Sequence, residues 1–202
     1  MEFYIRPEAR IQARTYDVVV CGGGTAGVFA ALAAARNGAK TALVEYKGYV
    51  GGIATEGGTG LHSFYNLWKA FPGVEKKKVI RGLPEEFIDR LTALGGASGH
   101  NEQLMNFGYD SDALCVDVEI YKFLALKMLR EAGVDVLLNT MVIGADTQNG
   151  RVKAVLTHSH GGGEALLARV FIDATGYGDV CAQAGADYAN PNDHPVANSM
   201  GV

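Results

Sequence analysis

The chain has 202 residues, 48% hydrophobic and 20% charged, a composition that suits a domain with a buried core and excludes a disordered chain. Its 27 glycines fall in clusters without a three-residue period, which excludes a collagen-like chain and indicates tight loops. The 18 basic and 22 acidic residues give a net charge of −4, which argues against a nucleic-acid binder that relies on phosphate contacts.

The first half of the chain contains a strand, a helix and a second strand in close succession. Residues 1–15 are polar and are expected to form an N-terminal surface arm. The β-branched run 16–21 predicts a buried parallel strand, 25–37 an alanine-rich helix, and 40–45 a second strand. These elements form a βαβ unit, whose crossover should be right-handed. The glycine-rich segment 46–82 has no clear period and is expected to be an extended loop.

Two helices are expected next, over 83–94 and 117–132, and Asp117 is a candidate N-cap for the second. A short apolar strand is expected over 134–138. The dipeptide Asn149-Gly150 then separates two strand-like runs, which predicts a β-hairpin.

A last strand-like segment, 164–173, ends in the apolar run VFID. The sequence therefore predicts an α/β fold. We expect a parallel sheet with helices and a small antiparallel meander.

The residues 22–27 spell the glycine pattern GxGxxG between the first predicted strand and the first predicted helix. In this context Gly22 permits a tight turn, Gly24 lets a pyrophosphate approach the backbone, and Gly27 lets the helix pack closely on the strand. The helix N-terminus offers N–H groups to the phosphates. Glu45 ends the second strand, where a carboxylate can accept hydrogen bonds from ribose hydroxyls. A dinucleotide site is therefore predicted here, in a Rossmann-like fold of the FAD/NAD(P)-binding type.

Four segments together resemble one family. The run 16–55, which ends in GGIAT, resembles the start of FAD-dependent oxidoreductases with a glutathione-reductase-type flavin domain. The resemblance continues through 81–97 and 117–134 and ends with FIDATGYGDVCAQAGADY at 171–188. It implies an FAD-binding domain over 16–189. Residues 190–202 would then be a tail or the start of a substrate domain.

The resemblance implies FAD as the cofactor and a set of residues around it. Gly51, Gly52, Ala54 and Thr55 would run beside the pyrophosphate toward the flavin, and Val142 would contact adenine through its backbone. Tyr177 stands where the family has an acid. The implied cofactor-binding residues are Gly22, Gly24, Thr25, Ala26, Gly27, Glu45, Tyr46, Gly51, Gly52, Ala54, Thr55, Val142, Ala174, Thr175, Gly176 and Asp179.

A catalytic side chain is harder to choose. The flavin would exchange a hydride with a small-molecule substrate, and His62 is a weak candidate for an acid or base. No metal site is expected, because the pair His158 and His160 lacks further ligands at suitable spacing. The absence of a cysteine pair after Gly52 and of a second GxGxxG argues against the pyridine-nucleotide disulfide reductases.

Two alternatives stay open at this stage: an NAD-binding dehydrogenase domain, and a non-catalytic nucleotide-binding module that needs a partner chain. The three cysteines contain no CxxC pair, and the first residues contain no apolar signal sequence, so we expect a cytoplasmic protein. Neither a membrane nor a nucleic acid is expected as a partner, and a homo-oligomer is left open.

Overall fold

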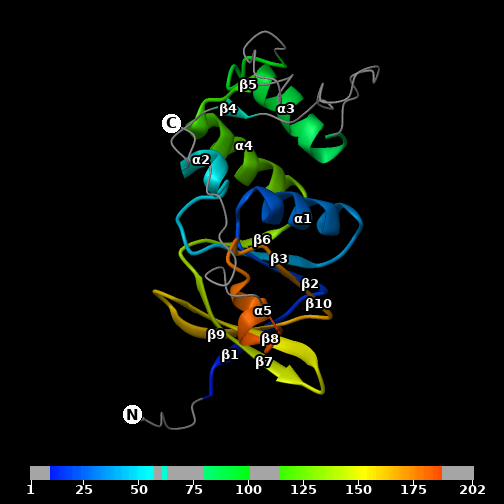
Figure 1. The fold of residues 1–202 in the computed structure, drawn as a ribbon, viewed down its shortest axis with the longest axis vertical. Coiled ribbons are helices and arrows are strands. Elements are labelled where there is room, and N and C mark those ends of the chain that lie inside the picture. The colour runs from blue at the N-terminus through cyan, green and yellow to red at the C-terminus, as the bar shows by residue number, and fades with distance from the viewer. Residues whose placement is uncertain (1–9, 57–60, 63–79, 101–113, 188–202) are drawn as a thin grey trace.

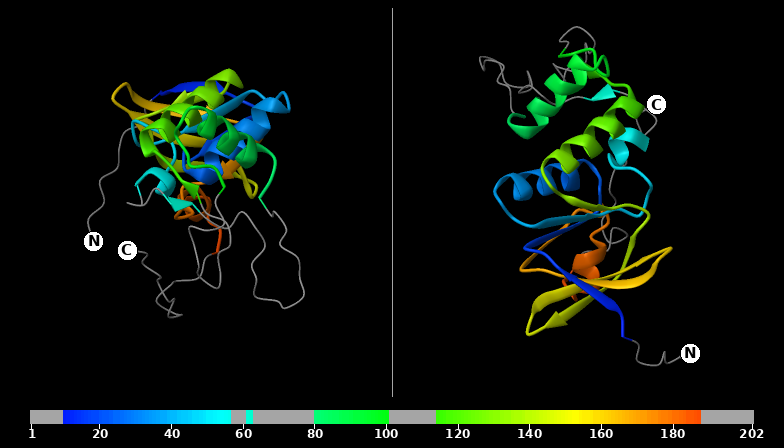
Figure 2. Two further views of the ribbon diagram at one scale, coloured as in Figure 1. Left: turned by 90° about the horizontal axis from the view of Figure 1, so that it is seen from above. Right: turned by 180° about the vertical axis from the view of Figure 1, so that it is seen from behind.

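Three layers are stacked along the long axis of the molecule (Figure 1): helices, a four-stranded parallel sheet, and a second four-stranded sheet. The computed structural model describes residues 10–56, 61–62, 80–100 and 114–187. The view from behind shows the same order of layers (Figure 2). The α/β, Rossmann-like fold class with an additional antiparallel meander is thereby confirmed.

The parallel sheet has the strand order β10-β2-β3-β6. Its strands are β2 (Val18–Cys21), β3 (Thr41–Val44), β6 (Asp135–Leu137) and β10 (Val170–Asp173). Successive side chains point to opposite faces, so Val20 of β2 joins the core beneath the helices, whereas Val19 and Cys21 join the core between the sheets. Both faces are covered, which explains why β2 is apolar throughout and why β3 is apolar after Thr41, which is itself buried.

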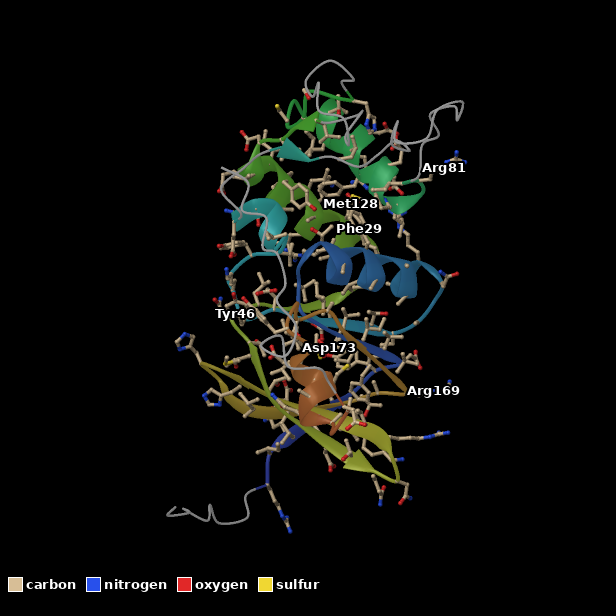
Figure 3. The ribbon with its side chains drawn as sticks, viewed as in Figure 1. Phe29, Tyr46, Arg81, Met128, Arg169 and Asp173 are labelled. Carbon is tan, nitrogen blue, oxygen red and sulfur yellow. The ribbon has the colours of Figure 1, made fainter. Side chains whose placement is uncertain are left out.

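Three helices form the layer on one face of the parallel sheet. They are α1 (Thr25–Arg36), α3 (Leu83–Ala93) and α4 (Val118–Glu131). The Asp117 carboxylate accepts hydrogen bonds from the Glu119 and Ile120 N–H groups, which confirms the expected N-cap of α4. Phe29 of α1 packs edge-on against Phe87 of α3, with ring centroids 5.8 Å apart. Figure 3 shows Phe29 and Met128 in this helical layer.

The second sheet has the order β1-β9-β8-β7. Its strands are β1 (Gln12–Thr15), β7 (Met141–Gln148), β8 (Arg151–Ser159) and β9 (Gly162–Leu167). The hairpin between β7 and β8 is confirmed, and its turn residues Asn149 and Gly150 have φ values of 53° and 71°, as a two-residue turn with positive φ requires.

Two sequence-based expectations differ from the structure in this sheet. The end of the expected N-terminal arm forms β1, which pairs in parallel with β9, so these residues belong to a sheet. The segment 164–173 is divided into β9 and β10, which lie in different sheets. Both differences arise because two segments leave one sheet for the other side by side. The Tyr16 N–H donates to the Leu167 carbonyl and the Val170 N–H donates to the Asp17 carbonyl. The β1–β2 and β9–β10 connections therefore pass between the sheets together.

Short elements complete the described residues. They are α2 (Ile53–Glu56), β4 (Leu61–His62), β5 (Leu114–Cys115) and α5 (Asp179–Gln183). The expectation of an uninterrupted loop over 46–82 is therefore wrong at α2 and β4, which are too short to show a period. Within the described residues, no helix combines the length and apolar character needed to cross a membrane.

Candidate dinucleotide-binding cleft

A cleft of about 830 Å³ lies at the carboxyl ends of β2, β3 and β10. Open α/β sheets bind ligands at this edge, because the strands there give way to loops that leave a crevice. The cleft is lined by Gly22, Gly24, Thr25, Ala26, Val44, Glu45, Tyr46, Lys47, Tyr49, Gly52, Ile53, Glu56, Thr140, Met141, Val142, Ala174, Thr175, Gly176, Tyr177 and Asp179.

The turn between β2 and α1 depends on glycine at two crowded positions. Gly22 has a φ of 103°, and a Cβ there would lie 2.2 Å from the Ala174 carbonyl oxygen. A Cβ on Gly27 would lie 1.8 Å from the Gly22 carbonyl oxygen, so the first turn of α1 touches the strand end directly. Both contacts are too short for any side chain, and the sequence-based role of Gly27 in close packing agrees with this geometry.

Gly24 is different because its surroundings are open. The nearest heavy atom to a Cβ at Gly24 would be the Gly52 Cα, 4.0 Å away. Gly24 is also the N-cap of α1, and as a glycine it has no side chain with which to cap this helix end. The exposed N-terminal N–H groups of α1 are therefore available to an anionic group in the cleft.

Glu45 is buried at the end of β3, with 6% of its surface exposed. Its Oε2 atom accepts a hydrogen bond of 2.6 Å from the Gly23 N–H, and its Oε1 atom accepts one of 2.8 Å from the Lys47 N–H. Each carboxylate oxygen has two lone pairs, so both retain acceptor capacity toward the cleft. Glu45, the predicted ligand of the ribose, thus also holds the glycine turn in place through its hydrogen bond to Gly23.

The Gly51-Gly52 segment packs against the same turn. The Gly51 N–H donates a hydrogen bond of 2.8 Å to the Gly23 carbonyl, and Gly24 forms a parallel bridge with Gly51. A Cβ on Gly52 would lie 2.8 Å from the Gly24 Cα, so the two backbones could not approach as closely with side chains there. The start of α2 is thereby held beside the start of α1.

The loop after β10 is organised by Asp173. Its Oδ1 atom accepts hydrogen bonds from the N–H and the hydroxyl of Thr175, and its Oδ2 atom accepts one from the Cys181 N–H. Burial alone would raise the pKa of Asp173, but these donors outweigh it and lower the pKa below its ordinary value. The Thr175 hydroxyl oxygen in turn accepts from the Asp179 N–H at 3.0 Å, which holds the start of α5.

Most of the residues that the sequence associates with FAD line the cleft. The exceptions are Gly27, Gly51, Ala54 and Thr55, which lie beneath its surface or beside it. Thr55 donates its hydroxyl to the Gly52 carbonyl at 3.0 Å, and Ala54 packs against the core under the helices.

Several lining residues were not anticipated from the sequence. Three of them, Ile53, Met141 and Tyr177, have large, exposed apolar or aromatic side chains, as does Tyr46, which the sequence did indicate. Tyr177 is 94% exposed. The unanticipated lining residues are Val44, Lys47, Tyr49, Ile53, Glu56, Thr140, Met141 and Tyr177. Their proximity depends on the path of the loops, and no motif in the sequence indicates it.

His62 lies in β4, opposite Leu114 of β5, and its side chain is outside the described residues. His158 and His160 lie at the end of β8 and just beyond it. No group of three or more histidine, cysteine or acidic residues suitable for a metal ion occurs in the described part of the chain.

A glycine turn that leads from a buried parallel strand into an uncapped helix, with a carboxylate at the end of the next strand, defines a dinucleotide-binding domain of the Rossmann type. Residues 17–200 match the family described as FAD-dependent oxidoreductase, and the chain belongs to that family. The family implies FAD as the cofactor.

Solved structures support the fold assignment. The chain resembles a geranylgeranyl bacteriochlorophyll reductase-like protein from Thermoplasma acidophilum, with 20% identity and a TM-score of 0.55 over 89% of this chain and 45% of that one. It resembles THI4 from Thermovibrio ammonificans, with 17% identity and a TM-score of 0.55 over 91% of this chain and 64% of that one.

A third match is the p-nitrophenol 4-monooxygenase PnpA from Pseudomonas putida, with 15% identity and a TM-score of 0.54. That match covers 87% of this chain and 43% of the monooxygenase. The chain therefore spans less than two thirds of the length of each of these proteins, and the likeness concerns the fold.

Proposed function

We propose that the cleft binds FAD and that the chain is an FAD-dependent oxidoreductase, or the FAD-binding portion of one, which transfers a hydride between a small-molecule substrate and the flavin. The observation that carries this proposal is the cleft at the strand ends, where the open backbone at Gly24 and the buried carboxylate of Glu45 face the same space. A volume of about 830 Å³ falls within the range of cofactor sites.

The residues present fit a dinucleotide. The uncapped N-terminus of α1, with Gly24 and Thr25, suits a diphosphate because its N–H groups and helix dipole favour negative charge. Glu45 suits the ribose hydroxyls, because its oxygens can accept further hydrogen bonds besides those from Gly23 and Lys47.

The apolar part of the cleft suits aromatic rings. Tyr46, Ile53, Met141 and Tyr177 all line it, and all are more than half exposed, so they offer apolar surface that a ring system can cover. Val142 of β7 lines the cleft beside Met141 and is our proposed neighbour of the adenine.

When bound, FAD supplies the redox chemistry by accepting or donating a hydride. The chain's part is to bind and orient it, through the α1 terminus and Glu45, and to keep water from the covered ring surface through the apolar side chains. We assign no residue of this chain to proton transfer, and the substrate is a small molecule of open identity.

The visible absorption spectrum of the purified protein tests the proposal. We expect FAD to bind and to show a flavin band that bleaches when dithionite is added. A parallel titration with NAD serves as the comparison. A protein that takes up no FAD but binds NAD would overturn the proposal in favour of a dehydrogenase domain. Dithionite reduces free and bound flavin alike, so the bleaching identifies the cofactor and is not a measure of catalysis.

A further inference from the structure

In the described part of the chain, one side chain supplies positive charge to the cleft. Among the described lining residues Lys47 is the one cation, whereas Glu45, Glu56 and Asp179 are carboxylates. The Lys47 ammonium group forms an ion pair with the Glu56 carboxylate and lies 5.2 Å from the centroid of the Tyr46 ring. Lys47 and both of these partners are lining residues of the cleft.

This ion pair is only partly accessible to water. The side chains of Lys47 and Glu56 are each 27% exposed, so solvent screens their interaction less than that of an open surface pair. Glu45 has two backbone N–H partners of its own, which leaves Glu56 as the carboxylate that engages the lysine.

The position of Glu56 follows from the Gly51-Gly52 segment. Gly52 touches the Gly24 backbone, and Glu56 lies one turn of α2 beyond it, with its N–H donating to the Gly52 carbonyl at 3.1 Å. The lysine–glutamate pair therefore lies close in sequence and structure to the segment that faces the uncapped end of α1. A diphosphate at that helix end carries about two negative charges and would compete with the single charge of Glu56 for the lysine.

We propose that the Lys47 ammonium group pairs with Glu56 in the apoprotein, and that a bound dinucleotide diphosphate replaces Glu56 as its ion-pair partner. This inference rests on the proposed function and specifies how the same cleft controls cofactor affinity. The exchange of partners sets the affinity for FAD.

Two other roles of the Lys47–Glu56 ion pair predict different effects on FAD binding. If the pair only fastens α2 to the loop after β3, removal of either partner should loosen the site and weaken FAD binding. If Glu56 acts only by long-range repulsion, its neutralisation should strengthen binding equally whether or not a lysine is present at position 47.

A double-mutant cycle separates these cases, with FAD dissociation constants measured by flavin fluorescence on the apoprotein. We expect Glu56→Gln to tighten FAD binding about 3- to 10-fold, since it releases the lysine, and Lys47→Met to weaken it about 10-fold. In the Lys47→Met background, Glu56→Gln should change affinity by less than about 2-fold. Lys47→Arg should retain most of the wild-type affinity.

Matched controls keep the net charge changes the same. Asp89→Asn on α3 and Lys153→Met on β8 alter exposed residues outside the cleft lining and should leave the dissociation constant within about 2-fold of wild type. Thermal unfolding of each apoprotein checks that it folds, and Lys47→Gln replaces Lys47→Met if the latter does not.

The outcomes are distinguishable. An equal gain from Glu56→Gln in both backgrounds, or a loss of affinity in that variant, would overturn the inference while the wild-type protein still binds FAD. A wild-type protein that binds no FAD would instead overturn the proposed function, and this inference with it.

Discussion

The Glu45 carboxylate lies 2.6 Å from the Gly23 backbone nitrogen, so the end of β3 holds the glycine turn at the end of β2. The same carboxylate receives the Lys47 N–H on its other oxygen. A residue that the sequence indicates as a ligand for ribose is therefore also a part of the fold. Substitution of Glu45 should affect cofactor affinity and protein stability together.

Glu45→Ala removes the acceptor for two backbone N–H groups, one of them buried. We expect the free energy of unfolding to fall by about 1–3 kcal/mol and FAD binding to weaken by a similar amount. Urea denaturation of the apoprotein and flavin fluorescence titration measure the two effects. Asp89→Ala on α3 is the control, and a Glu45→Ala protein with wild-type FAD affinity would remove Glu45 from the binding site.

Gly27→Ala places a methyl group where the Gly22 carbonyl oxygen lies, 1.8 Å from the ideal Cβ position. Backbone must move to relieve this contact, so we expect a loss of stability of about 1–3 kcal/mol or more and weaker FAD binding. The shift in the urea midpoint measures it. Gly161→Ala is the matched control, since its Cβ would lie 3.5 Å from the Ser159 hydroxyl oxygen and should cost less than about 0.5 kcal/mol. Equal midpoints for the two variants would contradict the crowding at Gly27.

Asp173→Asn tests the loop after β10. The amide cannot accept from all of the Thr175 and Cys181 donors, so we expect a loss of stability of about 1–2 kcal/mol at pH 7. The pKa of Asp173 is lowered in the folded protein, so its contribution is present above the ordinary carboxyl pKa and is lost as the pH falls through the folded value.

The difference in stability between the wild type and Asp173→Asn should therefore shrink on acidification below about pH 4. Urea denaturation at pH 7 and at pH 3.5 measures it. A difference that stays constant across this range would show that the carboxylate charge does not stabilise the loop.

Tyr16→Phe removes a hydrogen bond from the connection between β1 and β2 to the parallel sheet. The Tyr16 hydroxyl donates to Asp135, the first residue of β6, and Arg14 pairs with the same carboxylate at 3.1 Å. Burial, aided by the hydrogen bond to Asp135, raises the pKa of Tyr16 to about 12. We expect the variant to lose about 1 kcal/mol of stability at pH 8.

The sign of the pH effect follows from the raised pKa. The contribution of the neutral phenol is complete below about pH 10 and declines as the pH rises toward 12, so the wild type should lose its advantage over Tyr16→Phe in that range. Denaturation midpoints at pH 8 and pH 11 check this, and a difference that grows with pH would contradict it.

The β2–α1–β3 unit could be predicted from the sequence because its signals are local. The β-branched run that ends at Cys21, the alanine-rich helix and the glycines between them each favour one conformation. The hairpin between β7 and β8 could be predicted equally well, since Asn149 and Gly150 tolerate positive φ.

The pairing of β1 with β9 could not be predicted in this way. Gln12–Thr15 is a polar run without a strand period, and its partner lies in a distant part of the chain. The side chains of the cleft other than the glycines could not be predicted for the same reason, because Lys47, Glu56 and Tyr177 come together only through the paths of the loops. Residue type alone does not encode such convergence.

The joint crossing of the two sheets has a consequence for how the protein is made. Arg14 in β1 and Glu164 in β9 form an ion pair although 150 residues separate them in sequence. During synthesis β2 can pair with β3 early, but neither sheet closes until β9 and β10 have left the ribosome. Folding should thus include a slow, late step in which these distant strands pair, and until then the unpaired apolar edge of β2 is prone to aggregation.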